Sequence, residues 1–301
     1  MRRCNAMVAS YLRRLGIDDP GPPSVAALRA LHRAHVERVP YEVLEIQLGR
    51  PTSADPSEST ARVIGGRGGY CVQLNGAFTT LLRALGYAVT WHQATVQAGA
   101  EPPAPGVATA PHLAATVTLD GEVWLTDVGL GDGLHDPLPL RTGTYRQGPF
   151  TFTLAASAHQ PGGWRFDHDP RGSIRGMDFT LDPAGPADFA RWHPFLVTSP
   201  QSRLVRTVSV MRRDATTADS LTGCVLRHCD AAGRRSTELT TPTEWYAALA
   251  DVFGLALPDV DADARAALWA RVHGAHQRWL AARAAAGNNT AAGTKTVAVN
   301  G

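Results

Sequence analysis

The chain has 301 residues, of which 44% are hydrophobic and 19% are charged, a composition that is ordinary for a globular protein of two or three modest domains. Its formal net charge of +2 gives no electrostatic argument for nucleic acid or for an anionic membrane surface as a partner. No apolar run approaches the length of about 20 residues that spans a bilayer, and no apolar segment of a signal peptide follows the charged N-terminus. We therefore expect a cytoplasmic protein without a membrane partner.

The N-terminal part of the chain is predicted to be helical. Residues 6–16 and 24–39 have helical apolar spacing, and Ser24 is the expected cap of the second helix. A third helix is expected to begin at Cys71 and to stop at Gly86. Its apolar residues recur at helical spacing and are Leu74, Phe78, Leu81, Leu82 and Leu85. These helices predict a helical first domain over residues 1–86.

After Gly86 the pattern changes to short strands separated by turns. The expected strands are residues 87–96, 113–119, 123–127, 150–155 and 164–168. The insert at 99–110 is rich in Ala, Pro and Gly and is expected to be a flexible surface loop. Short alternating strands of this kind predict a small antiparallel barrel or curled sheet over residues 87–190.

The third region, residues 191–286, is expected to mix strands with helices. The strands are predicted at 205–211, 221–227 and 236–239, and the helices at 242–254 and 262–285. Residues 287–301 consist mainly of Ala, Gly, Asn and Thr without periodicity. We expect this tail to be disordered.

The four cysteines do not indicate a disulfide framework in a chain of this length, and they are Cys4, Cys71, Cys224 and Cys229. Cys224 and Cys229 flank His228, but no second ligand pair follows at the spacing of a zinc site. We expect reduced thiols and no metal site.

Cys71 lies where a thiol becomes a nucleophile. It follows Arg67-Gly68-Gly69-Tyr70 and opens a predicted helix, and the free N–H groups and positive dipole end of a helix N-terminus stabilise a thiolate over a thiol. The residue is therefore a candidate nucleophile.

A base and its partner are predicted to lie across one hairpin. His112 lies at the start of one strand, Asp120-Gly121 is a hairpin turn pair, and Asp127 ends the returning strand. The two side chains would then lie side by side. Cys71, His112 and Asp127 form a plausible catalytic triad, in which His112 takes the thiol proton and Asp127 fixes its tautomer.

Several ordered motifs resemble those of the arylamine N-acetyltransferases and their amide-synthase relatives. The resemblance is strongest from about residue 35 to 140 and weaker to about 285. Its pieces are Val39-Pro40-Tyr41-Glu42, Gly49-Arg50-Pro51, the stretch from Arg67 to Asn75, Pro111-His112, Asp127-Val128-Gly129-Leu130-Gly131 and Pro137-Leu138.

The resemblance implies an α+β fold with an N-terminal helical bundle, a central antiparallel β-barrel, a C-terminal α/β lid and a cysteine-protease-like Cys-His-Asp core. It implies that an acyl group passes from a thioester to Cys71 and then to an amine, with no tightly bound cofactor. It also suggests that Glu42 and Arg67 form an ion pair that holds the cysteine loop. The alternative for these two residues is a pair of solvated surface charges.

Three residues depart from the family pattern. Gln73 replaces a usual Glu, Val43 replaces a usual Asn, and Leu130 stands where many members have an aromatic residue. A smaller side chain at 130 would widen the pocket near Cys71. We assign supporting roles to Arg67, Glu42 and Gln73, and a substrate pocket to Tyr41, Tyr70, Val72, Leu130 and Phe179.

Gln73, Leu130 and the segment from His168 to Phe179 resemble the amide-synthase branch of the family. This branch takes a polyketide chain from an acyl carrier protein and closes it onto its own arylamine, which forms the macrolactam of ansamycin-type antibiotics. We favour this function and expect the 168–179 segment to border the acyl pocket. The glycines at 129, 131 and 133 would let a phosphopantetheine arm approach or form a plain turn.

Three other functions stay open. The first is an arylamine N-acetyltransferase that uses acetyl-coenzyme A and a free arylamine. A cysteine hydrolase would use the same triad, and a non-catalytic scaffold protein would tolerate loss of Cys71.

Overall fold

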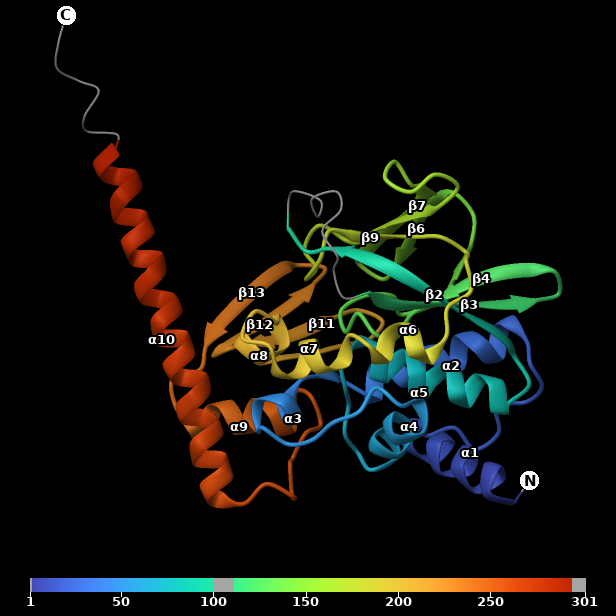
Figure 1. Ribbon diagram of the computed structural model, residues 1–301, viewed down its shortest axis with the longest axis horizontal. Helices are drawn as coiled ribbons and strands as arrows, with labels where there is room; N and C mark the ends of the chain where they lie inside the picture. The colour runs from blue at the N-terminus through green and yellow to red at the C-terminus, as the bar shows by residue number, and fades with distance from the viewer. Residues whose placement is uncertain (1, 100–110, 294–301) are drawn as a thin grey trace, which may run out of the picture.

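The computed structural model describes residues 2–99 and 111–293 (Figure 1). Most of the insert expected at 99–110, and the last part of the expected disordered tail, lie outside these residues. Among the described residues, no helix is both long enough and apolar enough to cross a bilayer.

In the described part of the N-terminal region, three helices and one short helix accompany the cysteine helix. Ser24 caps α2 as expected and accepts a hydrogen bond from the backbone N–H of Ala27 at 3.2 Å. A further helix, which was not expected from the sequence, begins at Pro56. Asp55 is its N-cap. The helices are α1 (Arg2–Leu15), α2 (Val25–Arg38), α3 (Leu44–Gln47), α4 (Pro56–Ile64) and α5 (Cys71–Ala84).

Eight antiparallel strands form a curled sheet above these helices (Figure 1). Their order is β5-β4-β3-β2-β9-β8-β7-β6, so that β5 and β6 are its two edges. Its inner face holds a core that includes Phe152, Phe166 and Phe179. The strands are β2 (Ala88–Gln97), β3 (His112–Leu119), β4 (Glu122–Thr126), β5 (Leu138–Pro139), β6 (Gly143–Gln147), β7 (Phe150–Ala156), β8 (Trp164–Asp167) and β9 (Gly176–Phe179).

A second antiparallel sheet combines one strand of the N-terminal region with four strands from the C-terminal part of the chain. Its first strand, β1 (Tyr41–Glu42), comes from the N-terminal region and pairs with β10, so that Tyr41 lies opposite Met211. The sheet continues in the order β10-β11-β12-β13. These strands are β10 (Ser209–Arg213), β11 (Ala218–Thr222), β12 (Val225–Asp230) and β13 (Gly233–Glu238).

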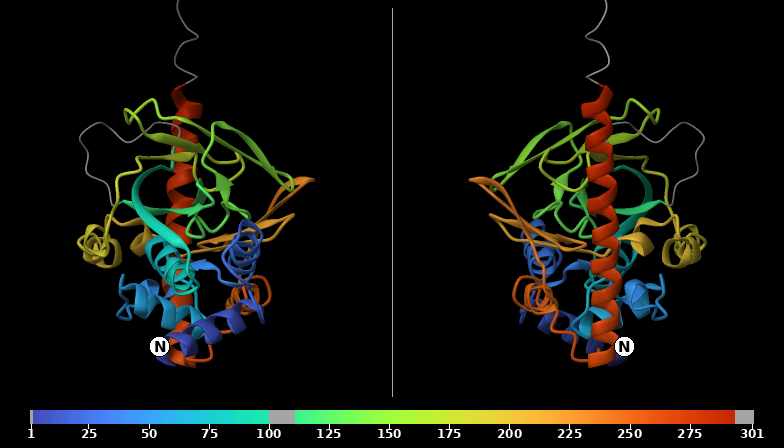
Figure 2. Two further views of the ribbon diagram at one scale, coloured as in Figure 1. Left: turned by 90° about the vertical axis from the view of Figure 1, so that its right-hand side faces the viewer. Right: turned by 90° about the vertical axis from the view of Figure 1, so that its left-hand side faces the viewer.

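The remaining helices connect and cover the two sheets, as Figure 2 shows from two sides. The first three are α6 (Pro186–Ala190), α7 (His193–Thr198) and α8 (Arg203–Arg206), and the last two are α9 (Pro242–Asp251) and α10 (Ala262–Gly293). The strand expected at 205–211 begins only at Ser209, because Ser202 caps α8 and accepts from the backbone N–H of Leu204.

Helix α10 is longer than expected. It continues to Gly293, past residue 285, where the sequence predicted its end. The reason is that the alanines at 284–286 favour helix more than any other residue and carry the helix onward. Figure 1 shows the C-terminal half of α10 extending past the sheets.

Candidate active site

Cys71 is the first residue of α5 and lies at its N-terminus. The side chain of Gln73 organises this helix end, because its Oε1 accepts from the backbone N–H of Tyr70 at 3.2 Å. Its amide nitrogen donates to the backbone oxygen of Ser53 at 2.7 Å and to Thr52 Oγ1. Gln73 therefore takes the position of the Glu in a capping box, and its hydrogen bonds connect the start of α5 to the loop at 52–53.

His112 and Asp127 meet across the predicted hairpin. Strands β3 and β4 pair with Leu119 opposite Glu122, and the turn residues Asp120 and Gly121 have φ values of 50° and 80°, as a two-residue turn of this kind requires. His112 Nε2 lies 2.6 Å from Asp127 Oδ2, and both side chains are buried.

Asn75 connects this pair to the cysteine helix. Its amide nitrogen donates to Asp127 Oδ1 at 2.8 Å and to the backbone oxygen of Leu113 at 2.6 Å. Its Oδ1 accepts from the backbone N–H of Val128 at 2.9 Å. We had not assigned Asn75 a role. Its place four residues after Cys71, on the same face of a buried helix, was the available signal.

Cys71 is the third member of the candidate triad, with His112 and Asp127. Cys71 and His112 line the same cavity, and Nδ1 of His112 is the ring nitrogen left for the thiol because Asp127 holds Nε2. Burial lowers the pKa of His112, but the charge of Asp127 and the contact with Cys71 outweigh it and raise this pKa to about 10. His112 is therefore a stronger base than a free imidazole.

Gly129 allows the loop after β4 to reach the cysteine helix. A Cβ at this position would lie 2.9 Å from the Cα of Cys71 and 2.6 Å from the amide nitrogen of Asn75. Gly131 has φ +77° and lies against Tyr41 and Met211, and Gly133 lies against Leu130. Close packing between protein segments explains these three glycines.

The expected ion pair between Glu42 and Arg67 is present, but Arg62 lies nearer to Glu42 than Arg67 does. Glu42 Oε1 lies 2.7 Å from Arg62, while Arg67 Nε is 3.6 Å away. Arg67 also lies 2.8 Å from Glu45. The Glu42 side chain is 0% exposed and that of Arg67 is 13% exposed, so they are not two solvated surface charges. Arg62 also donates from Nε to the backbone oxygen of Gly68, and it holds the cysteine loop more directly than Arg67 does.

We expect Arg62→Met to lower the free energy of unfolding by about 3 kcal/mol, because the variant leaves the buried Glu42 carboxylate without its nearest cation. Arg67→Met is expected to cost less, since Arg62 stays in place. Urea unfolding of the two variants measures the difference. A larger loss for Arg67→Met would contradict this ranking.

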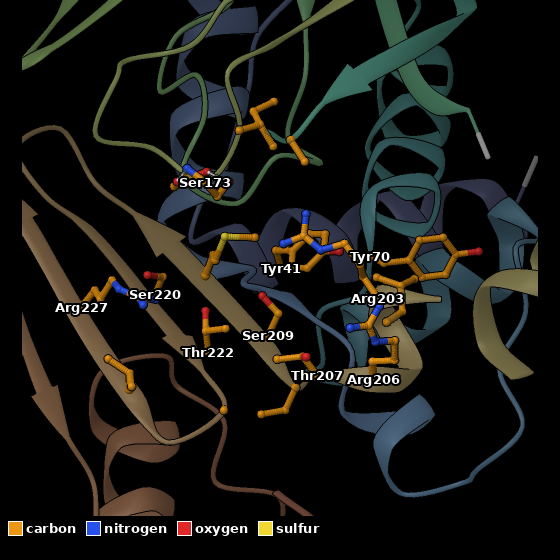
Figure 3. Close-up of a pocket in the computed structure, with 18 of the residues that line it drawn as sticks. Tyr41, Tyr70, Ser173, Arg203, Arg206, Thr207, Ser209, Ser220, Thr222 and Arg227 are labelled. Atoms are coloured by element: carbon orange, nitrogen blue, oxygen red, sulfur yellow. Dashed lines mark hydrogen bonds between the residues drawn. The ribbon is translucent and has the colours of Figure 1, made fainter. Parts of the chain in front are cut away.

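A cavity of about 1210 Å³ opens beside Cys71 and His112. Tyr41, Tyr70 and Leu130 line it, as expected. Figure 3 shows Tyr41 and Tyr70 on one side of this cavity. Tyr70 also forms a hydrogen bond with His193 Nδ1 at 2.8 Å, which fixes the tyrosine ring.

Two predicted pocket residues do not line the cavity. Val72 is 2% exposed and packs in a cluster with Trp91 and Phe189, because the helix turns this side chain away from Cys71. Phe179 is 0% exposed and lies in the core of the curled sheet. Both assignments to the pocket were wrong.

The first half of the 168–179 segment does border the cavity, through residues 168 and 171–174. Asp132 holds it there by accepting from both the backbone N–H and the hydroxyl of Ser173 at 2.7 Å. Burial lowers the pKa of His168, but Asp132, whose Oδ1 lies 3.5 Å from its ring, raises it overall. No pattern in the sequence predicts this buried pair.

Metal ligands do not gather in the part of the chain that the structure describes. No group of three or more His, Cys, Asp or Glu side chains there could hold a metal ion. Cys224 and Cys229 are buried and free.

A family model described as N-acetyltransferase matches residues 24–262. The chain belongs to the arylamine N-acetyltransferase family. The helices, the curled antiparallel sheet and the second sheet form the α+β fold of this family. The arylamine N-acetyltransferase of Mycobacterium abscessus has 28% sequence identity and a TM-score of 0.78, over 88% of this chain and 94% of that one. The arylamine N-acetyltransferase of Mycobacterium marinum in complex with CoA has 26% sequence identity and a TM-score of 0.78. The match covers 88% of this chain and 98% of that one.

Two curated family members illustrate the range of functions. The chain is 34% identical over 150 residues to the arylamine N-acetyltransferase / N-hydroxyarylamine O-acetyltransferase of Salmonella typhimurium, which covers 46% of this chain and 50% of that protein. It is 32% identical over 152 residues to the proansamycin X synthase of Amycolatopsis mediterranei, which covers 49% and 57%. The chain thus spans about half the length of these curated relatives.

Proposed function

We propose that this protein forms an amide from an acyl thioester and an arylamine through an acyl-Cys71 intermediate. The observation that carries the proposal is His112, which lines the same cavity as Cys71 and lies 2.6 Å from Asp127. This is the arrangement of a nucleophile, a base and a group that orients the base. The reducing cytoplasm is the setting in which such a thiol persists.

The reaction has two half-reactions. His112 takes the thiol proton, Cys71 Sγ attacks the thioester carbonyl, and the departing thiolate receives a proton from the imidazolium as the bond to the donor sulfur breaks. The arylamine nitrogen then attacks the acyl carbon and gives its proton to His112. The bond to Sγ breaks, the amide leaves, and the thiolate is restored. The backbone N–H of Cys71, at the start of α5, is placed to stabilise the oxyanion.

The size of the cavity favours a large acyl group. Its volume of about 1210 Å³ exceeds the range of about 300–1,000 Å³ that is usual for small-molecule pockets. Apolar side chains line the part next to the curled sheet, and they include Val96, Leu130, Phe150 and Ile174. We therefore propose intramolecular closure of a polyketide chain, delivered by an acyl carrier protein, to a macrolactam. The similarity to proansamycin X synthase supports this choice.

The second candidate is acetyl transfer from acetyl-coenzyme A to a free arylamine. It is favoured by the likeness to the CoA complex from Mycobacterium marinum, which covers 98% of that chain.

A comparison of two acyl donors distinguishes between these functions. We expect a long thioester that carries its own arylamine to be cyclised faster than acetyl-coenzyme A acetylates an arylamine, with mass spectrometry detecting both products. Fast acetylation without cyclisation would select the second candidate. A hydrolase would release free acid at a rate that added amine does not change, and no acyl group would accumulate on Cys71 when amine is withheld.

A further inference from the structure

The side chains that line the cavity carry a positive charge, although the net charge of the whole chain is close to zero. Seven arginines and two aspartates line the cavity, and the formal net charge of the chain is +2. Both aspartates are engaged, Asp132 by Ser173 and Asp219 by His228. Six of the arginines have no carboxylate within 4.0 Å in the described part of the chain. One of these six, Arg271, donates to the backbone oxygen of Gln47, which leaves five. We call these five the arginine rim, and they are Arg203, Arg206, Arg227, Arg234 and Arg278.

A row of hydroxyl groups lies between parts of the arginine rim. Ser209 pairs with Thr222 across β10 and β11, and the alternating residues Val210 and Leu221 point into the core, where both are 0% exposed. The polar face of these strands therefore faces the cavity. We call this the hydroxyl row, and it consists of Thr207, Ser209, Ser220 and Thr222. None of these hydroxyls forms a hydrogen bond within residues 2–99 and 111–293.

Helix α10 supplies another wall of the same cavity. Arg271, Ala275, Arg278 and Ala282 line it at intervals of three and four residues, so they share one face of the helix. Most of the helix from Gln277 to Arg283 is exposed, and Trp279 is 46% exposed. Figures 1 and 2 show this half of α10 extending past the sheets. The small alanines leave room for another polypeptide to approach this face.

The arginine rim is spread over four elements of the fold, which are α8, β12, β13 and α10. Figure 3 shows Arg203 and Arg206 on the side of Tyr41 and Tyr70, with Arg227 on the opposite side next to Ser220. Arg234 lies on β13 and Arg278 on α10. An extended acidic surface can contact several of these arginines together, and charge complementarity of this kind steers a protein partner to its docking site.

We propose that the mouth of the cavity is a docking surface for an acidic carrier protein that presents the acyl thioester on a phosphopantetheine arm. Carboxylates of the partner contact the arginine rim, and the hydroxyl row lines the path of the arm toward Cys71. The proposal rests on the proposed function, since it names the donor of the same acyl transfer. It assigns the arginines of α8, β12, β13 and α10 to a protein interface.

Charge reversal at two exposed rim positions tests this surface. The variant Arg234→Glu/Arg278→Glu is compared with wild type and with Arg146→Glu, which makes the same change at an exposed position on β6 outside the cavity. An acetyl group is supplied on a phosphopantetheinylated, acidic acyl carrier protein, on coenzyme A or on pantetheine, with p-anisidine as acceptor. KM is measured for each donor.

We expect the rim variant to raise the KM for the carrier-bound donor by at least about tenfold relative to the KM for acetyl-pantetheine, because like charges now oppose docking. Arg146→Glu should leave this ratio unchanged. Higher salt should weaken the wild-type preference for the carrier protein, since it screens exposed charges. An unchanged ratio in the rim variant would overturn the proposal. An equal rise for coenzyme A would also overturn it and assign the rim to free nucleotide.

Direct binding separates failure of docking from failure of the proposed function. If no donor supports acyl transfer, the proposed function is wrong, and calorimetric titration of the phosphopantetheinylated carrier protein still decides the docking surface. Binding to wild type and to Arg146→Glu, with loss in the rim variant, supports the surface. Absence of binding to wild type, or equal binding to all three proteins, refutes it.

Discussion

Replacement of Cys71 by alanine is expected to lower the rate of acyl transfer by at least about 10⁴-fold, which is the order of loss when a triad nucleophile is removed. The side chain is small and partly exposed at the start of α5, so the fold should survive. The thermal unfolding transition checks that it does. Amide formation and the acyl adduct on the peptide that contains residue 71 are measured by mass spectrometry.

Cys224→Ala is the matched control for this variant. Burial raises the pKa of the Cys224 thiol to about 11, so it stays protonated and unreactive near neutral pH. We expect the control to keep its transfer rate and its adduct on residue 71. Transfer by Cys71→Ala at more than about a tenth of the wild-type rate would place the nucleophile elsewhere.

Asp127→Asn is expected to lower the transfer rate by about 10³- to 10⁴-fold, because the amide cannot supply the carboxylate charge and can hold His112 in the wrong tautomer. The hydrogen bonds from Asn75 and from the backbone N–H of Gly129 to Oδ1 keep position 127 in place. Asp136→Asn removes a carboxylate from a surface pair with Arg33 and should leave the rate unchanged. Retention of most activity by Asp127→Asn would refute the proposed role.

The loss of stability in Asp127→Asn is expected to depend on pH. The pKa of His112 is raised from 6.5 to about 10, so the folded protein binds this proton more tightly than the unfolded chain does. The resulting stabilisation is fully present below pH 6.5 and is lost as the pH rises through about 10. The difference in unfolding free energy between wild type and Asp127→Asn should therefore be largest near pH 6 and shrink toward pH 10. A difference that grows over this range would contradict the raised pKa.

The local parts of the site were predictable because their signals are local. The Asp120-Gly121 turn sets the register of one hairpin, and that register alone brings His112 next to Asp127. The start of α5 at Cys71 follows from apolar spacing over one helix. In contrast, proximity in the sequence is a poor guide to the pocket. The side chain of Val72 points into a buried cluster, whereas the adjacent Cys71 lines the cavity.

The ion pairs of the cysteine loop could not be predicted in the same way. Glu42 has two arginines within 4 Å, and the nearer one is Arg62 on α4, a helix that the sequence analysis did not expect. Which cation pairs with a buried carboxylate depends on how helices and loops pack, and no short-range pattern records it.

The sequence by itself determined the family and predicted the candidate nucleophile, base and orienting carboxylate, because these depend on residue types within short motifs and one hairpin. Only the tertiary structure decided the extent of the cavity, the links through Asn75 and Arg62, and the charge at the cavity mouth. The arginines there come from α8, β12, β13 and α10. Their charges act together only because folding brings these distant segments around one opening, where few carboxylates offset them.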